Sequence, residues 1–295
     1  MEVKTPWTKF YGKVPKHIDY PEFTLSEMVL NVAKLCPEDT ALVYMGKTLS
    51  YKQLECEILR TQQMLLNIGV RKGDRVAVCL PNIPQAVYLL YALDRMGAVA
   101  AFVHPLSAPL EIVRYLKELD AVCVIALDSM CSVFNEVASH INLQKVIFTS
   151  PADELGKLKR IIYSLRTKKK SAPRCQQVKE WRKLKSKCNS TEVQKADVKA
   201  DDTSVVLFSG GTTGEPKGVM LSGRALNAMA MQTALMSGTE VSKKAMLSAI
   251  WRFYLQNNSI LLHTLWRNSD EGKKNYFPME CNGWSTFAFC CNWIQ

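Results

Sequence analysis

The chain has 295 residues, of which 47% are hydrophobic, and its formal net charge at pH 7 is +11. That length and composition indicate a globular protein with a large core and about two domains. Its uninterrupted apolar runs, such as 86–93 and 96–103, are far shorter than the roughly 18 to 20 residues that a membrane-spanning helix needs, so we expect no such helix.

The N-terminal stretch and the cysteines indicate a cytoplasmic protein. The first 20 residues are polar and punctuated by proline, and they lack the apolar core and the small-residue cleavage site of a secretion signal. The ten cysteines show no Cys-x-x-Cys spacing, and Cys79 and Cys123 lie inside apolar runs, where cysteine acts as a small hydrophobic residue. A reducing compartment fits this usage best.

Residues 22–150 alternate between helical and strand-like patterns. Helical spacing occurs at 23–35, 51–69, 84–96 and 110–119, a hairpin pattern at 41–51, and strand-like runs at 71–80, 98–103, 121–127 and 145–150. Thr24 and Glu27 have the spacing of a capping box, and Gly97 stands where a helix should end. Strands separated by helices of this length pair in parallel through right-handed crossovers. The predicted fold class is therefore α/β, with layered, mostly parallel sheets and helices on both faces.

The positive charge is concentrated in one segment. Residues 157–187 hold thirteen Lys or Arg and one acidic residue, a net charge of +12, which leaves −1 for the rest of the chain. The segment is either a solvated, partly disordered linker or an attachment to an anionic surface, where each basic residue contributes about 1 kcal/mol. Tyr163 and Trp181 are its only aromatic residues, which argues against stacking on single-stranded nucleic acid. We expect it to be exposed and partly helical, with an anionic membrane as the candidate partner and no nucleic acid.

A glycine-rich stretch follows the next strand-like run. The run 203–208 is apolar and β-branched, 218–221 is again strand-like, and Ser222 is placed to cap a helix over 224–236. Residues 207–218 read LFSGGTTGEPKG, with glycines that would be costly in a regular element. The sequence predicts an exposed loop at the end of a buried strand, which is where ligands bind in open α/β sheets.

The residue types in this loop favour a phosphate ligand. Successive backbone N–H groups of a glycine-rich turn converge on an anion, the hydroxyls of Ser209, Thr212 and Thr213 add donors, and Lys217 adds a positive charge. The stretch is not a Walker-type phosphate loop, which needs Gly before the lysine and Ser or Thr after it. It is not a Gly-x-Gly-x-x-Gly dinucleotide fingerprint either.

The same stretch resembles the signature of the adenylate-forming, or AMP-binding, superfamily, which includes acyl-CoA synthetases, firefly luciferases and the adenylation domains of peptide synthetases. That signature reads Ser or Thr, Ser or Gly, Gly, Thr, Thr, Gly, any residue, Pro, Lys, Gly, and residues 209–218, SGGTTGEPKG, satisfy every position. Residues 41–54, 73–99 and 104–128 are similar to further segments of the family, so the resemblance covers roughly 22–150 and 201–250. The paired glycines Gly210 and Gly211 and the N-terminal half look most like a fatty acyl-CoA synthetase.

The resemblance implies a two-step reaction with ATP, Mg²⁺ and coenzyme A as cofactors. A carboxylic acid, here of the fatty-acid class, attacks the α-phosphorus of ATP to give an acyl-adenylate, and the thiol of coenzyme A then takes the acyl group. In the family this loop binds the β- and γ-phosphates, where preorganised donors and cations stabilise developing charge. This role carries over to Ser209, Gly210, Gly211, Thr212, Thr213, Gly214 and Lys217. Catalytic residues and metal ligands are not assigned.

The resemblance ends near residue 250. The family's aromatic adenine-binding motif, its ribose-binding aspartate, its hinge and its C-terminal lysine have no recognisable counterpart, and residues 251–295 keep no helical or strand period. His263 lies there without an apparent acid–base partner and is interpreted as incidental. We expect an N-terminal portion of an ATP-dependent acyl-CoA synthetase that is truncated and inactive as this isolated chain. The alternative is a non-catalytic phosphate- or nucleotide-binding module with a basic membrane-surface segment.

The expected organisation has five parts. They are an N-terminal arm (1–21), the N-terminal α/β part of an AMP-binding domain (22–150), a basic insertion or linker (151–200), the phosphate-loop part of the same domain (201–250) and an atypical tail (251–295). The expected location is cytoplasmic, with the basic segment as the feature that would bring the chain to a membrane surface.

Overall fold

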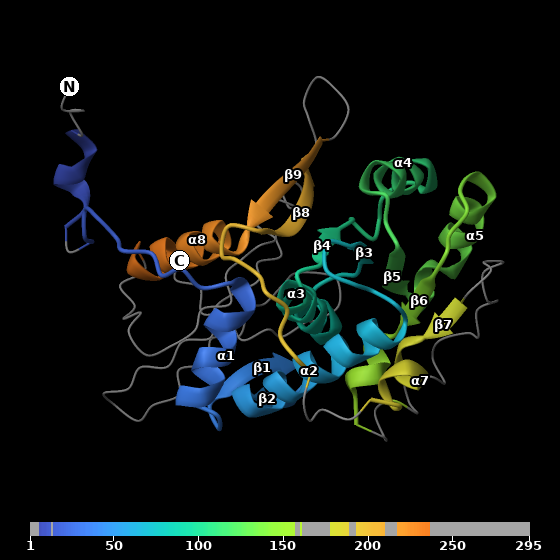
Figure 1. The fold of residues 1–295 in the computed structure, drawn as a ribbon, viewed down its shortest axis with the longest axis horizontal. Coiled ribbons are helices and arrows are strands. Elements are labelled where there is room, and N and C mark those ends of the chain that lie inside the picture. The colour runs from blue at the N-terminus through green and yellow to red at the C-terminus, as the bar shows by residue number, and fades with distance from the viewer. Residues whose placement is uncertain are drawn as a thin grey trace.

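The described residues form a seven-stranded sheet at the centre of the protein (Figure 1). The computed structural model describes residues 6–12, 14–156, 160, 178–188, 193–209 and 217–236. The strands follow the order β7-β6-β5-β3-β4-β8-β9 and are β3 (Arg75–Cys79), β4 (Val99–Phe102), β5 (Cys123–Leu127), β6 (Val146–Thr149), β7 (Val178–Glu180), β8 (Thr203–Ser209) and β9 (Lys217–Ser222). All neighbouring pairs are parallel except β8 and β9, which are antiparallel. The α/β fold with a mostly parallel sheet is confirmed.

Helices cover both faces of this sheet (Figure 1). One face carries α1 (Leu25–Leu35), α2 (Tyr51–Asn67) and α3 (Pro84–Met96), and the other carries α4 (Pro109–Leu119) and α5 (Cys131–His140). The remaining described elements are the hairpin β1 (Thr40–Tyr44) and β2 (Lys47–Ser50), the helices α7 (Trp181–Lys185) and α8 (Gly223–Met236), and the 3-10 turns η1 (Pro6–Phe10), η2 (Asp128–Met130) and η3 (Pro151–Glu154).

The local start and stop signals act as the sequence predicts. The Thr24 hydroxyl accepts a hydrogen bond from the backbone N–H of Glu27, and the Glu27 carboxylate accepts one from the N–H of Thr24, so the capping box at the start of α1 is closed. Helix α3 ends at Gly97, whose φ of 68° is the left-handed conformation that glycine adopts without strain. The Ser222 hydroxyl accepts from the N–H of Ala225 at the start of α8. These predicted boundaries are confirmed.

Two layers of apolar side chains fill the space between the sheet and the helices. Helix α3 lies between the sheet and the outer helices, and its Leu89 and Leu93 are fully buried. On the opposite face, Ile112 of α4 and Phe134 of α5 are fully buried against the strands. Burial of one such side chain contributes about 1.5 to 3 kcal/mol, so both helical layers hold the sheet.

Part of the expected basic linker belongs to this α/β body. Strand β7 pairs in parallel with β6 and is the outermost described strand on that side of the sheet. Trp181 of α7 is only 1% exposed, and the side chain of Lys185 is only 11% exposed. The expectation of an exposed segment is therefore wrong for Trp181, Lys185 and Cys188, which pack against the α/β body, whereas Glu180 and Lys183 are exposed as expected. Apart from Arg160, residues 157–177 lie outside the described residues.

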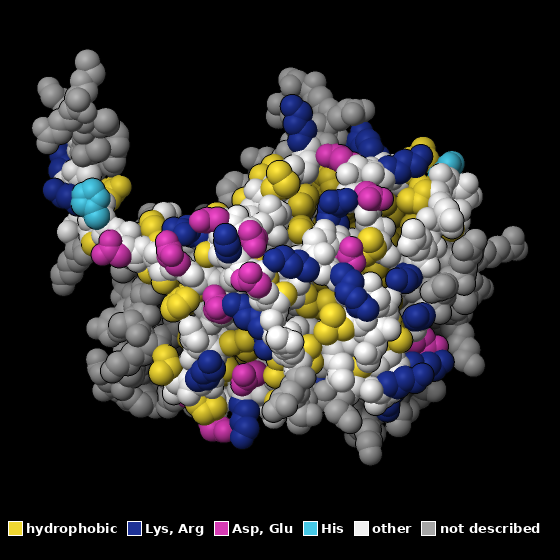
Figure 2. Space-filling view, in the orientation of Figure 1, with side chains coloured by type: hydrophobic (Ala, Val, Ile, Leu, Met, Phe, Trp, Pro, Cys, Tyr) yellow, Lys and Arg dark blue, Asp and Glu magenta, His cyan; other side chains and the backbone are white. Residues whose placement is uncertain are grey.

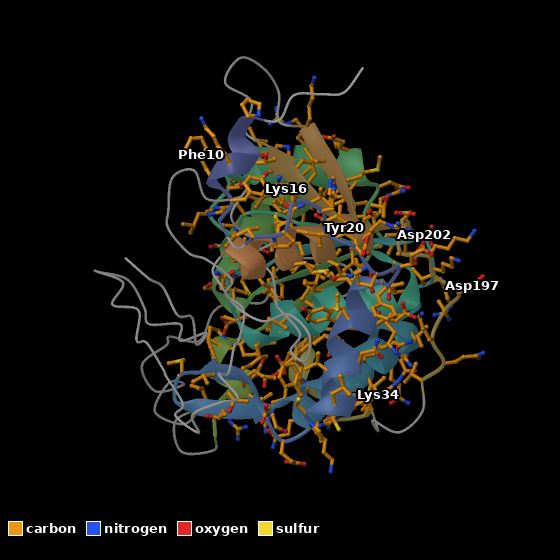
Figure 3. The ribbon with its side chains drawn as sticks, turned by 90° about the vertical axis from the view of Figure 1, so that its left-hand side faces the viewer. Phe10, Lys16, Tyr20, Lys34, Asp197 and Asp202 are labelled. Carbon is orange, nitrogen blue, oxygen red and sulfur yellow. The ribbon has the colours of Figure 1, made fainter. Side chains whose placement is uncertain are left out.

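The N-terminal arm contacts helix α8. The Tyr20 hydroxyl, labelled in Figure 3, accepts a hydrogen bond of 2.7 Å from Gln232 of α8. Arg224 of the same helix pairs with Glu22 at 3.2 Å and with Asp201 at 2.8 Å.

In the described part of the chain, no helix is long and apolar enough to cross a membrane. The expected tail at 251–295 lies outside the described residues.

Candidate functional site

The glycine-rich stretch connects two paired strands at the carboxyl edge of the sheet. Strand β8 is parallel to β4, which is parallel to β3, so the carboxyl ends of all three lie at one edge. Strand β9 returns antiparallel to β8, and Ser209 and Lys217 are the last pair before the loop (Figure 1). The strands therefore extend further than predicted, and the loop expected at 207–218 is shorter at both ends. Ligands of open α/β sheets bind at this edge.

Two of the predicted phosphate-binding residues are described. Ser209 ends β8, and Lys217 begins β9 with an exposed side chain. An exposed cation beside the carboxyl ends of parallel strands has the charge that a phosphate group requires. Predicted residues Gly210, Gly211, Thr212, Thr213 and Gly214 lie outside the described residues.

Helix α4 contacts both strands at the base of the loop. The ring of Tyr115 stacks on that of Phe208 in β8, with ring centroids 4.1 Å apart and an interplanar angle of 26°. The carboxylate of Glu118 accepts a hydrogen bond of 3.4 Å from the backbone N–H of Gly218 in β9. The sequence analysis did not single out these side chains, because an aromatic and an acidic residue on an amphipathic helix carry no motif.

A histidine follows strand β4 at the same edge of the sheet. His104 Nδ1 accepts a hydrogen bond of 3.2 Å from the N–H of Leu106. Burial lowers the pKa of His104 below its usual range, and the carboxylate of Glu111 opposes that effect only in part. Burial therefore favours the neutral form of the imidazole. Its position directly after an apolar strand was the available sequence signal, although no motif includes it.

The beginning of β8 is fixed by a buried carboxylate. Asp94 of α3 is 1% exposed and accepts a hydrogen bond of 2.7 Å from the backbone N–H of Ser26 in the first turn of α1. Its other oxygen accepts a hydrogen bond from the hydroxyl of Ser204 in β8. Asp94 thus connects α1, α3 and the strand that leads into the loop.

The charges on the described surface are mixed. Figure 2 shows Lys and Arg side chains interspersed with Asp and Glu side chains over the visible face. The net charge outside residues 157–187 is −1, which agrees with this view. On this face of the described residues, positive and negative side chains are therefore mixed.

Solved structures share this fold. A long-chain-fatty-acid–CoA ligase from Archaeoglobus fulgidus superposes with a TM-score of 0.59 and 22% identity, over 76% of this chain and 41% of that protein. An anthranilate CoA ligase in complex with anthranoyl-AMP superposes with a TM-score of 0.58 and 16% identity, over 75% of this chain and 38% of that protein. At these identities the likeness concerns the fold.

The sequence comparisons extend over the α/β body and the hairpin. A long-chain-fatty-acid–CoA ligase of Bacillus subtilis (strain 168) is 30% identical over 228 residues, which are 75% of this chain and 40% of the relative. The chain thus spans about 40% of the length of the curated relatives it matches. Residues 30–254 match the family described as AMP-binding enzyme. This match includes every strand of the central sheet and the complete glycine-rich signature, and the chain belongs to the AMP-binding enzyme family.

Proposed function

We propose that this chain supplies the phosphate-binding part of an ATP-dependent acyl-CoA synthetase of the fatty-acid class. The observation that carries the proposal is the hairpin of β8 and β9, which holds the two ends of the SGGTTGEPKG signature at the carboxyl edge of the sheet. The long-chain-fatty-acid–CoA ligases among the relatives support the acyl class. The reaction is adenylation of a carboxylate, followed by thioester formation with coenzyme A.

The proposed roles follow from the chemistry of the loop. Its backbone N–H groups and the hydroxyls of Ser209, Thr212 and Thr213 would donate to the β- and γ-phosphates, and Lys217 would neutralise part of their charge. Gly210, Gly211 and Gly214 would let the backbone approach the phosphates. Bound Mg²⁺ would neutralise further charge on the triphosphate. The cytoplasm, where ATP and coenzyme A are available, is the proposed location.

The Lys217→Ala substitution tests this assignment. We expect Mg²⁺–ATP and pyrophosphate to bind at least about tenfold more weakly, because a hydrogen bond to a charged group contributes about 1.5 to 3 kcal/mol. Titration calorimetry on the 295-residue chain measures the change. Lys34→Ala, which removes an exposed lysine of α1, is the matched control. Equal affinities in all three proteins would refute the role of Lys217.

We further propose that the 295 residues alone bind nucleotide without useful turnover. Adenylation requires the carboxylate and the α-phosphorus to be held in line, and positioning can lower the barrier by about 7 to 11 kcal/mol. The sequence contains no recognisable group that fixes the adenine, the ribose or the acyl chain. Acid-dependent ATP–pyrophosphate exchange that disappears in Lys217→Ala would contradict this part of the proposal.

The second candidate function is binding to an anionic membrane surface through residues 157–187, whose net charge of +12 favours it. We expect binding to phosphatidylserine vesicles that weakens steeply with salt, because the Debye length falls from about 10 Å at 0.1 M to about 3 Å at 1 M. Neutralising Lys168, Lys169 and Lys170 should weaken vesicle co-sedimentation. The control neutralises the same number of exposed lysines elsewhere, Lys34, Lys52 and Lys117. Equal loss in both variants would show that net charge alone, and not this segment, is responsible.

A further inference from the structure

The two strands that carry the glycine-rich loop are contacted by one face of α4. Phe208 and Gly218 are register partners in the hairpin, one pair before its last pair Ser209 and Lys217. Directly opposed residues of an antiparallel pair lie on the same face of the sheet. Tyr115 contacts Phe208, and Glu118, three residues further along α4, contacts Gly218. Residues three apart are neighbours on a helix surface, so one patch of α4 reaches both strands.

The Tyr115 ring is held in place from its own helix. Its hydroxyl donates a hydrogen bond to the carboxylate of Glu111, one turn earlier. Burial raises the pKa of Tyr115, and the hydrogen bond to Glu111 raises it further, so the hydroxyl remains a donor throughout the neutral range. Tyr115 and Phe208 are 5% and 8% exposed. The stacked pair is therefore a buried contact that fixes the end of β8 against α4.

A side chain at position 218 would be crowded by Val206 of the neighbouring strand. A Cβ at Gly218 would lie 3.2 Å from Cγ1 of Val206 and 3.5 Å from the Glu118 carboxylate. The distance to Glu118 is an ordinary van der Waals contact, so the hydrogen bond of Glu118 to the N–H of residue 218 does not itself require glycine. Among the described strands, β9 is the outermost on its side of the sheet, and its neighbour is β8. Glu118 therefore gives the exposed end of β9 a second support.

We propose that Tyr115 and Glu118, named here the α4 clamp, are positioning residues that hold the two ends of the glycine-rich loop at the separation needed to bind a phosphate group. This inference rests on the proposed function of the loop. A loop whose ends are fixed loses less conformational freedom when it binds, and affinity rises accordingly. The exposed carboxylate of Glu118 would itself repel a phosphate. If Glu118 acts mainly by fixing the loop ends, removing its side chain should weaken phosphate binding. If its negative charge dominates, removing the charge should strengthen binding.

Substitutions of Glu118 separate the two effects. We expect Glu118→Ala to bind Mg²⁺–pyrophosphate about two- to tenfold more weakly, the range for one lost hydrogen bond, although the variant removes a negative charge. Glu118→Gln removes the same charge but keeps an acceptor oxygen, and we expect it to bind at least as tightly as the unaltered chain. Higher affinity in both variants would show a pure charge effect and overturn the proposal.

Substitutions of Tyr115 test whether its stacked ring supports binding. Tyr115→Leu removes the stacked ring and should weaken binding about two- to tenfold, whereas Tyr115→Phe keeps the ring and should remain close to the unaltered chain. Glu136→Ala, which removes an exposed carboxylate from α5 in the same layer, is the control and should not weaken binding. Equal weakening in Tyr115→Phe and Tyr115→Leu would contradict a role for the stacked ring.

Hydrogen exchange of the Gly218 amide tests the clamp without any ligand. Exchange should be faster in Glu118→Ala than in Glu118→Gln or the unaltered chain, at equal global stability. If the unaltered chain binds no pyrophosphate, the proposed function fails, and the exchange experiment still decides whether the clamp exists. Equal exchange in all three proteins would overturn it.

Discussion

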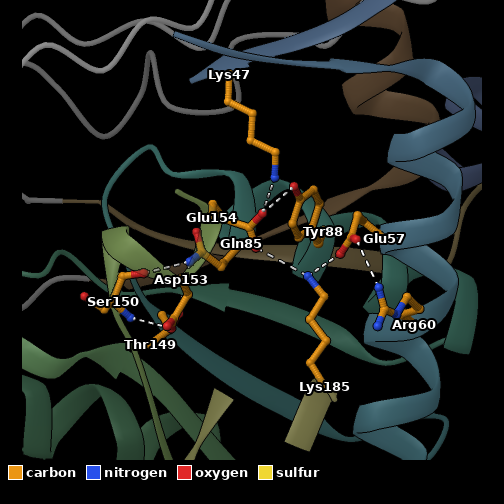
Figure 4. A network of polar contacts seen from close by, with 10 residues as sticks. All are labelled: Lys47, Glu57, Arg60, Gln85, Tyr88, Thr149, Ser150, Asp153, Glu154 and Lys185. Carbon is orange, nitrogen blue, oxygen red and sulfur yellow. Dashed lines mark hydrogen bonds and ion pairs between the residues drawn. The ribbon is translucent and has the colours of Figure 1, made fainter. Parts of the chain in front are cut away.

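Replacing Lys185 with methionine is expected to lower the free energy of unfolding by about 3 kcal/mol. The Lys185 ammonium group lies between two carboxylates, those of Glu57 in α2 and Glu154 in η3 (Figure 4). It is 3.4 Å from an oxygen of Glu154, and the side chains of Lys185 and Glu154 are only 11% and 7% exposed. Removing Lys185 takes away the nearest cation from two carboxylates that have little access to water, which is costly.

The expected loss of stability lies at the lower end of the range for broken buried ion pairs, because other groups still contact the two carboxylates. Lys47 remains 3.6 Å from Glu154, and Arg60 remains 3.5 Å from Glu57, so neither carboxylate is left without a cation. The Tyr88 hydroxyl continues to donate to Glu154 at 3.3 Å. The variant also loses the contact of Lys185 with the face of the Tyr88 ring, 4.6 Å from its centroid. Urea denaturation measures the sum of these changes.

Lys183→Met is the matched control, because Lys183 lies on the same helix and pairs with Glu180 at 2.8 Å. Both of those side chains are well exposed, at 75% and 61%. Exposed pairs typically contribute about 0 to 1 kcal/mol, so the control should change stability far less. Similar losses in the two variants would show that Lys185 acts as an ordinary surface lysine.

The burial of Lys185 could not be predicted from the sequence. The basic composition of 157–187 favoured a solvated segment, because runs of charge are usually solvated. Its partners Glu57 and Glu154 are distant in the sequence, and strand β7 spans only Val178–Glu180, too short to show a period. Burial of this lysine depends on tertiary contacts, which no local pattern encodes.

Local signals, in contrast, predicted most of the α/β body. The capping box at Thr24 and the glycine at position 97 each set a helix boundary through contacts within a few residues. The glycine-rich signature predicted a loop at 207–218 between two strands, and the structure extends those strands to Ser209 and Lys217. The contact of Glu118 with Gly218 joins residues 100 positions apart, so the sequence alone could not reveal it.

The Asp94→Ala substitution should also destabilise the fold by about 3 kcal/mol. Asp94 is almost fully buried, and its two carboxylate oxygens accept from the N–H of Ser26 and from the hydroxyl of Ser204. Hydrogen bonds to charged groups contribute about 1.5 to 3 kcal/mol each, and a buried donor left without an acceptor adds to the loss. The Ser26 N–H belongs to the first turn of α1, where a negative charge also interacts favourably with the helix dipole.

Asp94→Asn separates the loss of these hydrogen bonds from the loss of charge. The amide oxygen can accept from the Ser26 N–H while the amide nitrogen donates to the Ser204 hydroxyl, so both contacts survive without the charge. We expect this variant to lose about 1 kcal/mol or less, the size of the dipole interaction, when both are compared by urea denaturation. Because Asp94 holds the beginning of β8 and Tyr115 holds its end, Asp94→Ala should also weaken pyrophosphate binding, and Asp94→Asn should not. An equal loss of stability in the two variants would mean that the charge, and not the hydrogen-bond geometry, holds α1 against β8.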